Sequence, residues 1–176
     1  KRIFDIVGSL FLIIITSPIL ILTAVAVKLD SCGPVFWSKL DDGSPVQRIG
    51  QNGEPFHYFK FRSMKPGTHN LRYTELAEQD LRKGPLVKIK DDPRVTRVGR
   101  FIRRFSIDEL PELFLVLAGK MSLVGPRPHL PEEVAKYKKN HKKVLIVKPG
   151  ITGLAQISGR ADLDFEDEVK IDVYYI

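Results

Sequence analysis

The pattern of hydrophobic and polar positions divides this chain into one long apolar segment and a longer mixed part. Residues 6–27 form a run of 22 without a charged side chain, flanked by Lys1, Arg2 and Asp5 on one side and Lys28 on the other. A helix of that length, at about 1.5 Å per residue, would cross a bilayer core of roughly 30 Å. The pattern therefore predicts a membrane helix within residues 1–30.

The apolar segment allows several arrangements. From the residues alone, a helix that spans the bilayer ranks slightly ahead of a re-entrant helix, which enters and leaves on one side. A signal peptide fits poorly because no small-residue cleavage pattern follows, and so long an uncharged run would dominate the core of a small soluble domain. Ser17-Pro18 lies near the middle, where proline removes one backbone hydrogen bond and can kink the helix. Basic residues at both ends favour a cytosolic location for both.

Residues 31–176 predict one mixed α/β domain, mainly helical with a small β-hairpin or sheet. Segments 46–49 and 56–62 flank Asn52-Gly53, which is typical of a hairpin with a slightly long loop. Residues 69–83 predict a polar helix to which we assign no chemistry.

The pair Asp108-Glu109 is the strongest candidate for chemistry. It follows Arg103 and Arg104 and lies at the start of an expected helix. The arginines and the helix N-terminus favour charged carboxylates, the form that nucleophilic attack or Mg²⁺ binding requires.

A structural interpretation of the same pair competes with the catalytic one. Ser106 and Glu109 fit a capping box, and Asp108 could itself be the N-cap. Pro111 favours Asp108, because a proline at position N3 loses no helical hydrogen bond whereas one at N5 does. Gly119 would then end the helix. The local sequence supports capping and catalysis about equally.

The positive charge points to anionic partners. The net charge is +7, and residues 88–104 hold seven basic side chains just before the carboxylate pair. Arg127 stands between Pro126 and Pro128, on a stiff loop suited to a bidentate phosphate contact, although such an arginine can equally point at water. On the expected second strand, alternation places Lys60 and Arg62 on one face, as a candidate anion contact.

Other segments are less specific. Residues 148–160 hold three glycines, which allow tight turns near a ligand but match no standard nucleotide motif. Residues 132–143 hold five lysines around Tyr137, which predicts an interfacial amphipathic helix on anionic membrane lipid. No nucleic-acid module is recognisable, so we expect no nucleic-acid partner. The single cysteine, Cys32, allows no internal disulfide and predicts a reducing compartment. The four histidines lack metal-ligand spacing, so we expect no zinc site.

Several motifs together carry a resemblance to a known family. They are Lys1-Arg2-Ile3-Phe4-Asp5, Ser17-Pro18, Gly33-Pro34-Val35-Phe36, Lys60-Phe61-Arg62-Ser63-Met64, Asp92-Pro93-Arg94-Val95-Thr96, Asp108-Glu109-Leu110-Pro111, Gly125-Pro126-Arg127-Pro128 and Lys148-Pro149-Gly150-Ile151-Thr152-Gly153. In this order they resemble the bacterial sugar transferases, the monotopic phosphoglycosyl transferases, over nearly the whole chain. Residues 39–46 depart from the resemblance as an apparent insertion, and the chain stops where family members usually continue.

The resemblance implies a reaction. A sugar 1-phosphate would move from a UDP-sugar to polyprenol (undecaprenyl) phosphate, giving UMP and a polyprenyl diphosphate sugar. Asp108 would form a covalent phosphosugar ester, Glu109 would help to hold Mg²⁺, and Arg127 would grip a phosphate. The other residues expected in the phosphate-binding set are Lys60, Arg62, Arg94, Arg103, Gln156 and Arg160.

The resemblance also implies a location. It replaces the spanning helix by a re-entrant helix over residues 1–30, broken at Ser17-Pro18, with both ends cytosolic. The catalytic domain, residues 31–176, would face the cytosol from the bacterial inner (cytoplasmic) membrane. The sequence leaves the oligomeric state open, with a homodimer as one candidate. The alternative from another class is a membrane-tethered binding protein that holds anionic lipid or nucleic acid without catalysis.

Overall fold

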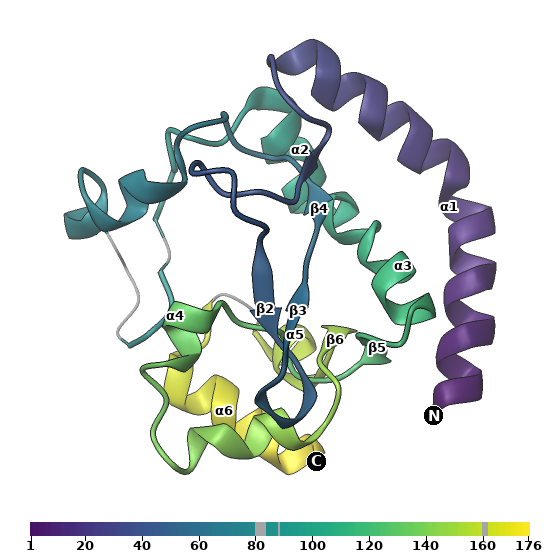
Figure 1. Cartoon of the computed structure of the whole chain (residues 1–176), viewed down its shortest axis with the longest axis vertical. Coiled ribbons are helices and arrows are strands. Elements are labelled where there is room, and N and C mark those ends of the chain that lie inside the picture. Colours follow the sequence, from purple (N-terminus) through teal and green to yellow (C-terminus); the bar gives the residue numbers. More distant parts are fainter. Residues whose placement is uncertain (80–83, 88, 160–161) are drawn as a thin grey trace.

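The computed structural model describes residues 1–79, 84–87, 89–159 and 162–176 (Figure 1). Its helices are α1 (Arg2–Asp30), α2 (Arg97–Arg104), α3 (Glu112–Leu117), α4 (Pro131–Val134), α5 (Leu154–Ser158) and α6 (Phe165–Tyr175). Its strands are β1 (Phe36–Trp37), β2 (Gln47–Ile49), β3 (Pro55–His57), β4 (Lys60–Phe61), β5 (Ser122–Val124) and β6 (Gly150–Thr152). Short 3₁₀ turns occupy Gln51–Gly53, His69–Tyr73, Ala77–Gln79, Ile107–Glu109 and His141–Ile146. The mixed, mainly helical class is confirmed.

Helix α1 is a single helix that bends near its middle and lies along one side of the domain (Figure 1). Pro18 offers no N–H to the carbonyl of Ile14, and the Ser17 hydroxyl donates to that carbonyl instead, at 2.8 Å. The helix therefore continues through the expected break. Only 11% of its most apolar window is buried, which argues against a core helix, and its length and composition are those of a helix able to cross a membrane.

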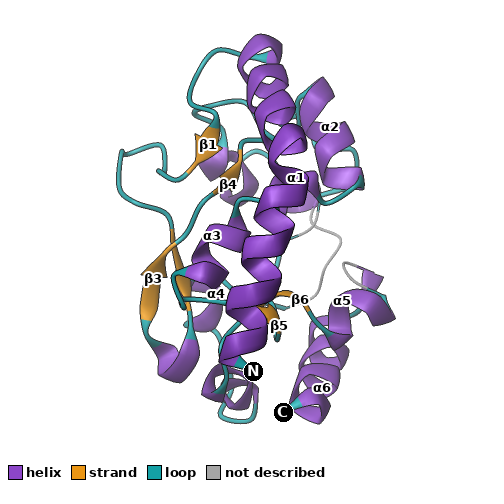
Figure 2. Ribbon diagram, turned by 90° about the vertical axis from the view of Figure 1, so that its right-hand side faces the viewer, coloured by secondary structure: helices purple, strands orange, loops and turns teal. Residues whose placement is uncertain are grey.

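The N-terminal end of α1 is anchored to the domain by polar contacts. Arg2 donates to two carbonyls at the end of α3, at 2.6 and 2.7 Å. The buried Asp5 carboxylate accepts hydrogen bonds from the Ser122 hydroxyl at 2.9 Å and the Leu123 amide at 3.0 Å. These contacts fix the start of α1 against β5, and Figure 2 shows the helix passing in front of α3.

The C-terminal end of α1 is anchored to the same domain. The Asp30 carboxylate accepts from the Val98 amide at the start of α2, at 3.1 Å. Arg62 donates to the carbonyls of Pro34 at 2.6 Å and Ser31 at 2.9 Å, where the helix has just ended. A cation at this position also complements the negative end of the helix dipole. Both ends of α1 are thus held by one folded unit.

Replacing Asp5 by Ala should destabilise the protein by about 1–3 kcal/mol, because the Ser122 hydroxyl and Leu123 amide would lose their buried acceptor. Thermal unfolding in detergent micelles measures this. Asp167→Ala, at an exposed position of α6, is the matched control and should change little. Equal melting temperatures for the Asp5 variant and the parent would contradict this role.

The strands form three two-stranded sheets among the described residues. β2 and β3 make the expected hairpin around Asn52-Gly53, both in the left-handed region (φ 59° and 81°). β1 pairs antiparallel with β4, and β5 pairs parallel with β6. The main core packs the hairpin against α3 and the segment that follows it; its buried residues are Val46, Phe56, Tyr58, Leu115, Val116 and Met121.

Three expectations need correction. The second hairpin strand stops at His57, and β4 pairs elsewhere, so strict alternation over 56–62 fails and Tyr58 and Phe61 are both buried. Residues 69–79 form two 3₁₀ turns rather than a polar helix, and 80–83 lie outside the described residues. Segment 132–143 is not one helix: α4 ends at Val134, and Tyr137 packs in a buried cluster with Phe165, so it is no membrane anchor.

The apparent insertion at 39–46 forms a short loop whose two ends lie side by side. Lys39 pairs with Pro45 in an isolated antiparallel bridge, and the Leu40 amide donates to the Ser44 carbonyl at 2.8 Å. Its last residue, Val46, is fully buried in the main core. The segment therefore folds back on itself and returns the chain to β2 without disturbing the hairpin.

Candidate active site

The carboxylate pair lies on a short turn between two helices. Asp108 and Glu109 belong to the 3₁₀ turn Ile107–Glu109, and both are buried. Ser106, just before it, is left-handed (φ 56°), an uncommon conformation for a residue other than glycine. Helix α3 begins only at Glu112, with Pro111 at its N-cap. The prediction that the helix starts with Asp108 as its N-cap is therefore wrong. The chain turns at Ser106, and the carboxylate pair lies in a separate 3₁₀ turn before the helix.

Lys60 reaches the first carboxylate. Its Nζ lies 2.9 Å from Oδ2 of Asp108, and its side chain is largely buried. Lys60 comes from β4, which packs beside the turn of Asp108 because the neighbouring Phe61 is fixed in the core with Ile102. The structure thus brings one predicted phosphate-binding cation directly to Asp108.

Arg127 reaches the second carboxylate. Its Nη1 lies 2.8 Å from Oε1 of Glu109, and a third of its side chain is exposed. The negative charge of Glu109 raises the pKa of Arg127 above its ordinary value, so the guanidinium stays charged. Asp108 and Glu109 therefore each pair with a cation from a different segment of the chain, so that two adjacent carboxylates are flanked by two cations.

The glycine-rich run explains the position of Arg127. The Gly125 amide donates to the Thr152 carbonyl and the Gly150 amide to the Pro126 carbonyl, each at 2.8 Å. A Cβ on Gly150 would lie 2.1 Å from the Gly125 nitrogen, and one on Gly153 2.3 Å from the Gly125 oxygen. These glycines allow two backbone segments to touch, rather than forming a turn around a ligand, and they hold the Arg127 loop against β6.

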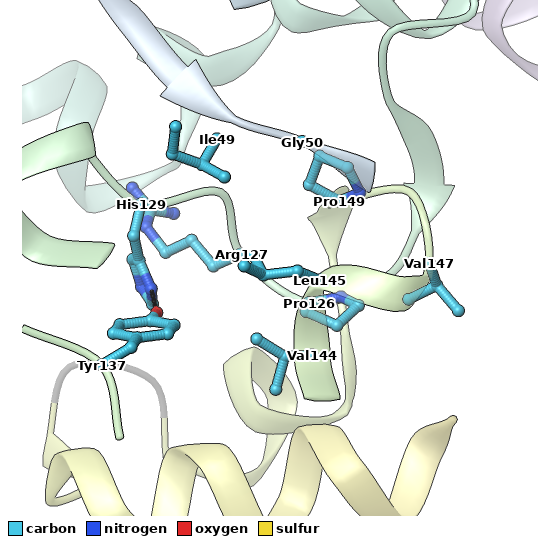
Figure 3. A pocket seen from close by; sticks show the side chains of 10 residues that line it. All are labelled: Ile49, Gly50, Pro126, Arg127, His129, Tyr137, Val144, Leu145, Val147 and Pro149. Atoms are coloured by element: carbon cyan, nitrogen blue, oxygen red, sulfur yellow. Dashed lines mark hydrogen bonds between the residues drawn. The ribbon is translucent and has the colours of Figure 1, made fainter. Parts of the chain in front are cut away.

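A small cavity lies behind this loop (Figure 3). Arg127, His129 and Tyr137 line it together with Ile49 and apolar neighbours, and its volume is about 10 Å³. That space is about what one water molecule occupies, far less than a nucleotide sugar requires. A nucleotide sugar therefore does not fit in this cavity, and any contact that it makes with Arg127 involves the partly exposed part of that side chain.

Sequence reasoning missed a third carboxylate. Glu112 is buried in the first turn of α3, three residues after Glu109, and accepts a hydrogen bond from the Tyr58 hydroxyl. Burial, with the nearby charge of Glu109, raises the pKa of Glu112 to about 7. The spacing of three residues was a usable signal, since residues i and i+3 share a helix face.

The raised pKa makes stability depend on pH. Between pH 4.5 and 7 the folded state binds more protons than the unfolded state, so the unfolding free energy should fall as pH rises through 7. In Glu112→Gln the fall in unfolding free energy between pH 4.5 and 7 should be smaller by up to roughly 3 kcal/mol, because glutamine cannot ionise. Burial also raises the pKa of Asp172 to about 7. Asp172 therefore lowers the unfolding free energy with rising pH in both the parent and the Glu112→Gln variant.

Melting temperatures of the parent and Glu112→Gln from pH 5 to 8 test this. Glu54→Gln, at an exposed position of the hairpin loop, is the control and should keep the parental slope. Parallel curves for parent and Glu112→Gln would rule out a titrating Glu112.

The other predicted phosphate-binding residues lie elsewhere. Arg62 caps α1, as described above, and Arg94 pairs with Asp92 through two nitrogens, at 2.6 and 2.9 Å. Arg103 is exposed at the end of α2. Both amide atoms of Gln156 on α5 are buried, with no hydrogen-bond partner among the described residues. Arg160 lies outside those residues. The structure therefore unites Lys60, Asp108, Glu109 and Arg127.

The pair does not form a complete metal site by itself. Among the described residues, no group of three or more His, Cys, Asp or Glu side chains is placed to hold a metal ion. Two adjacent carboxylates still fit the usual mode of Mg²⁺ binding, in which one or two carboxylates act together with substrate phosphates. The donor set thus suits a metal that arrives with a diphosphate.

Comparison with known proteins identifies the family of this chain. A family model described as bacterial sugar transferase matches residues 1–176. The chain is 42% identical over 177 residues to the galactosyl transferase CpsE of Streptococcus agalactiae and 42% identical over 179 residues to the undecaprenyl-phosphate galactose phosphotransferase of Salmonella typhimurium. All of this chain is covered, and it spans 37% and 36% of the length of those relatives.

A shorter relative is covered more completely. The chain is 40% identical over 176 residues to the uncharacterized sugar transferase EpsL of Bacillus subtilis, covering all of this chain and 77% of that protein. The match of the family model over the whole chain, together with these identities, shows that the chain belongs to the bacterial sugar transferase family.

Proposed function

We propose that this chain transfers a sugar 1-phosphate from a UDP-sugar to undecaprenyl phosphate, releasing UMP, as a membrane step in the assembly of a surface glycan. The observation that carries the proposal is the cluster in which Lys60 pairs with Asp108 and Arg127 pairs with Glu109. Relatives named as undecaprenyl-phosphate galactose and glucose phosphotransferases support the substrate class.

The first step is attack by Asp108. One carboxylate oxygen forms a bond to the β-phosphorus of the UDP-sugar, the bond from that phosphorus to the bridging oxygen breaks, and UMP leaves with the electron pair. Lys60, held 2.9 Å from Asp108, meets the incoming diphosphate as a positive charge. The burial of Asp108 limits access of water to the resulting phosphosugar ester.

The second step returns Asp108 to its starting state. A phosphate oxygen of undecaprenyl phosphate attacks the same phosphorus, the bond to the Asp108 oxygen breaks, and undecaprenyl diphosphate sugar is formed. Arg127, with its partly exposed side chain, can hold the phosphate groups in both steps. Attack by water instead would make the protein a hydrolase.

Mg²⁺ is the metal that this donor set suits. Glu109, with Asp108 beside it, would hold the ion against the diphosphate, and a bound ion would neutralise the charge that develops on departing UMP.

We further propose that α1 enters and leaves the membrane on one side, with the catalytic domain at the cytosolic face of the bacterial inner membrane. Both ends of α1 are anchored to the same domain, through Asp5 and Asp30, which supports this arrangement over a spanning one. Helix α2 adds exposed arginines beside the exposed Phe101, and this combination suits anionic lipid better than segment 132–143. Labelling of single cysteines near residues 1 and 28 from both sides of sealed vesicles would contradict the proposal if they react from opposite sides.

Incubation of membrane-reconstituted protein with Mg²⁺, undecaprenyl phosphate and a panel of UDP-sugars tests the proposed reaction. We expect one or more sugars to give UMP and a lipid-linked diphosphate sugar. Free sugar phosphate as the only product would indicate a hydrolase. Lipid binding without any turnover across the panel would favour the membrane-tethered binding protein.

A further inference from the structure

Three aromatic side chains form a row beside the carboxylate pair. The first, Trp37 of β1, stands directly opposite Lys60 of β4, so these two side chains lie on the same face of the antiparallel pair. The next pair in the register agrees with this, because Phe36 and Phe61 stack on the other face with their ring centroids 5.3 Å apart. Lys60 itself reaches Asp108. The row therefore begins one side chain away from the proposed nucleophile.

The row continues from Trp37 to the 3₁₀ turn His69–Tyr73. The rings of Trp37 and His69 are inclined by only 29°, but their centroids are 5.6 Å apart. Such an offset means that each ring covers only part of the face of the other. The ring of Tyr73 stands at 79° to that of His69, with centroids 6.5 Å apart, and Tyr73 is 43% exposed. The aromatic row, which consists of Trp37, His69 and Tyr73, therefore runs from Lys60 to the surface of the protein.

Two other segments of the chain fix His69 in the aromatic row. The Asp41 carboxylate, in the apparent insertion at 39–46, accepts a hydrogen bond from the His69 amide at 3.0 Å. The Arg94 guanidinium donates to the carbonyls of Thr68 and His69, at 3.4 and 3.3 Å. The insertion and Arg94 therefore both hold the turn that carries His69.

The position of the aromatic row suits a ligand that arrives from water. In Figure 1 the turn His69–Tyr73 lies on the side of β4 away from the apolar helix α1. Polar groups accompany the outermost ring, because the Tyr73 hydroxyl donates to Glu132 at 3.0 Å and Arg72 pairs with the same carboxylate at 3.0 Å. A nucleobase is a planar, uncharged ring with polar atoms on its edge, and it can stack on aromatic rings while that edge stays hydrogen-bonded.

We infer that the aromatic row binds the uracil of the UDP-sugar by stacking, which places the diphosphate beside Lys60 and Asp108. The inference rests on the proposed function and names the site of one part of its first substrate. The transferred sugar is bonded directly to the β-phosphate, whereas the ribose and the α-phosphate separate uracil from it. A row that begins beside Lys60 and ends at the surface meets that requirement, but the cavity behind Arg127 holds about one water molecule.

Fluorescence gives a direct test of the inference, because Trp37 is the only tryptophan of the chain. With Mg²⁺ present, UMP should quench this fluorescence in a saturable way, and ribose 5-phosphate, which lacks the base, should not. Tyr73→Ala should raise the Kd for UMP about five- to tenfold, because it removes one stacking ring. Tyr174→Ala, which removes an 84% exposed tyrosine on α6, is the matched control and should keep the parental Kd.

Steady-state kinetics separate binding of the base from the chemical steps. Tyr73→Ala should raise the KM for the UDP-sugar about five- to tenfold and change kcat by less than about twofold. Tyr73→Phe keeps the ring and should restore the parental KM.

Several results would overturn the inference. Quenching by ribose 5-phosphate or galactose 1-phosphate as strong as that by UMP would show that the row responds to phosphate or to the sugar. UMP that binds in equilibrium dialysis without changing the fluorescence, or with parental affinity in Tyr73→Ala, would place the base elsewhere. Absence of UMP binding to the parent, together with no UMP release from any UDP-sugar, would instead refute the proposed function.

Discussion

Replacing Asp108 by Asn is expected to reduce sugar-phosphate transfer by roughly 10³-fold or more, because an amide cannot attack phosphorus as a carboxylate does. Both UMP release and lipid-linked product should fall together, since the first bond is never formed. Association with membranes should survive, because the substitution does not touch the apolar helix α1. Initial rates with the preferred UDP-sugar measure the effect.

The control for this substitution is Asp167→Asn, an exposed aspartate that pairs with Lys170 on α6. It should retain parental activity and stability. The melting temperature of Asp108→Asn should fall, because the largely buried Lys60 loses its charged partner. Rates are therefore compared at a temperature well below the melting temperature of both proteins, which separates loss of chemistry from loss of fold. Turnover within tenfold of the parent would exclude Asp108 as the nucleophile.

Replacing Glu109 by Gln is expected to lower kcat/KM by about 10²–10³-fold. The change keeps the shape of the side chain but removes the charge that faces Arg127 at 2.8 Å. Because the proposed Mg²⁺ would lose one of its two protein carboxylates, the Mg²⁺ concentration for half-maximal rate should rise several-fold. Activity measured across a Mg²⁺ titration separates this effect from simple loss of rate.

Glu54→Gln is the matched control, because it removes one negative charge from an exposed hairpin position. Its Mg²⁺ dependence should follow the parental curve. If Glu109→Gln lowers the rate but leaves the half-maximal Mg²⁺ concentration unchanged, Glu109 acts by positioning Arg127 rather than by holding the metal.

Part of the site could be predicted because its residues occur in short, chemically restrictive motifs. The adjacent carboxylates and the proline-flanked Arg127 identify three members of the cluster, and the structure places Nη1 of Arg127 2.8 Å from Oε1 of Glu109. Lys60 was proposed from an alternation that the structure does not keep, and it reaches Asp108 from the separate strand β4. The hairpin at Asn52-Gly53 was predictable because its turn requires left-handed residues.

The remainder depends on tertiary contacts that no local pattern fixes. Arg62 and Arg94 belong to motifs that predicted phosphate contacts. In the structure, however, Arg62 donates to a carbonyl at the end of α1, and Arg94 pairs with Asp92. Tyr137 lies among lysines, yet its ring is buried against Phe165. Glu112 looked like an ordinary helix residue until Tyr58, more than fifty positions earlier, was seen to donate to it. Such pairings are decided by how the elements pack.

The most direct test of the central proposal is the mass of the intact protein after incubation with the preferred UDP-sugar and Mg²⁺ in the absence of lipid acceptor. We expect an increase equal to one sugar phosphate, located on Asp108 by peptide mapping, absent in Asp108→Asn, and discharged when undecaprenyl phosphate is added. Full turnover without such an adduct, or an adduct on another residue, would contradict the account.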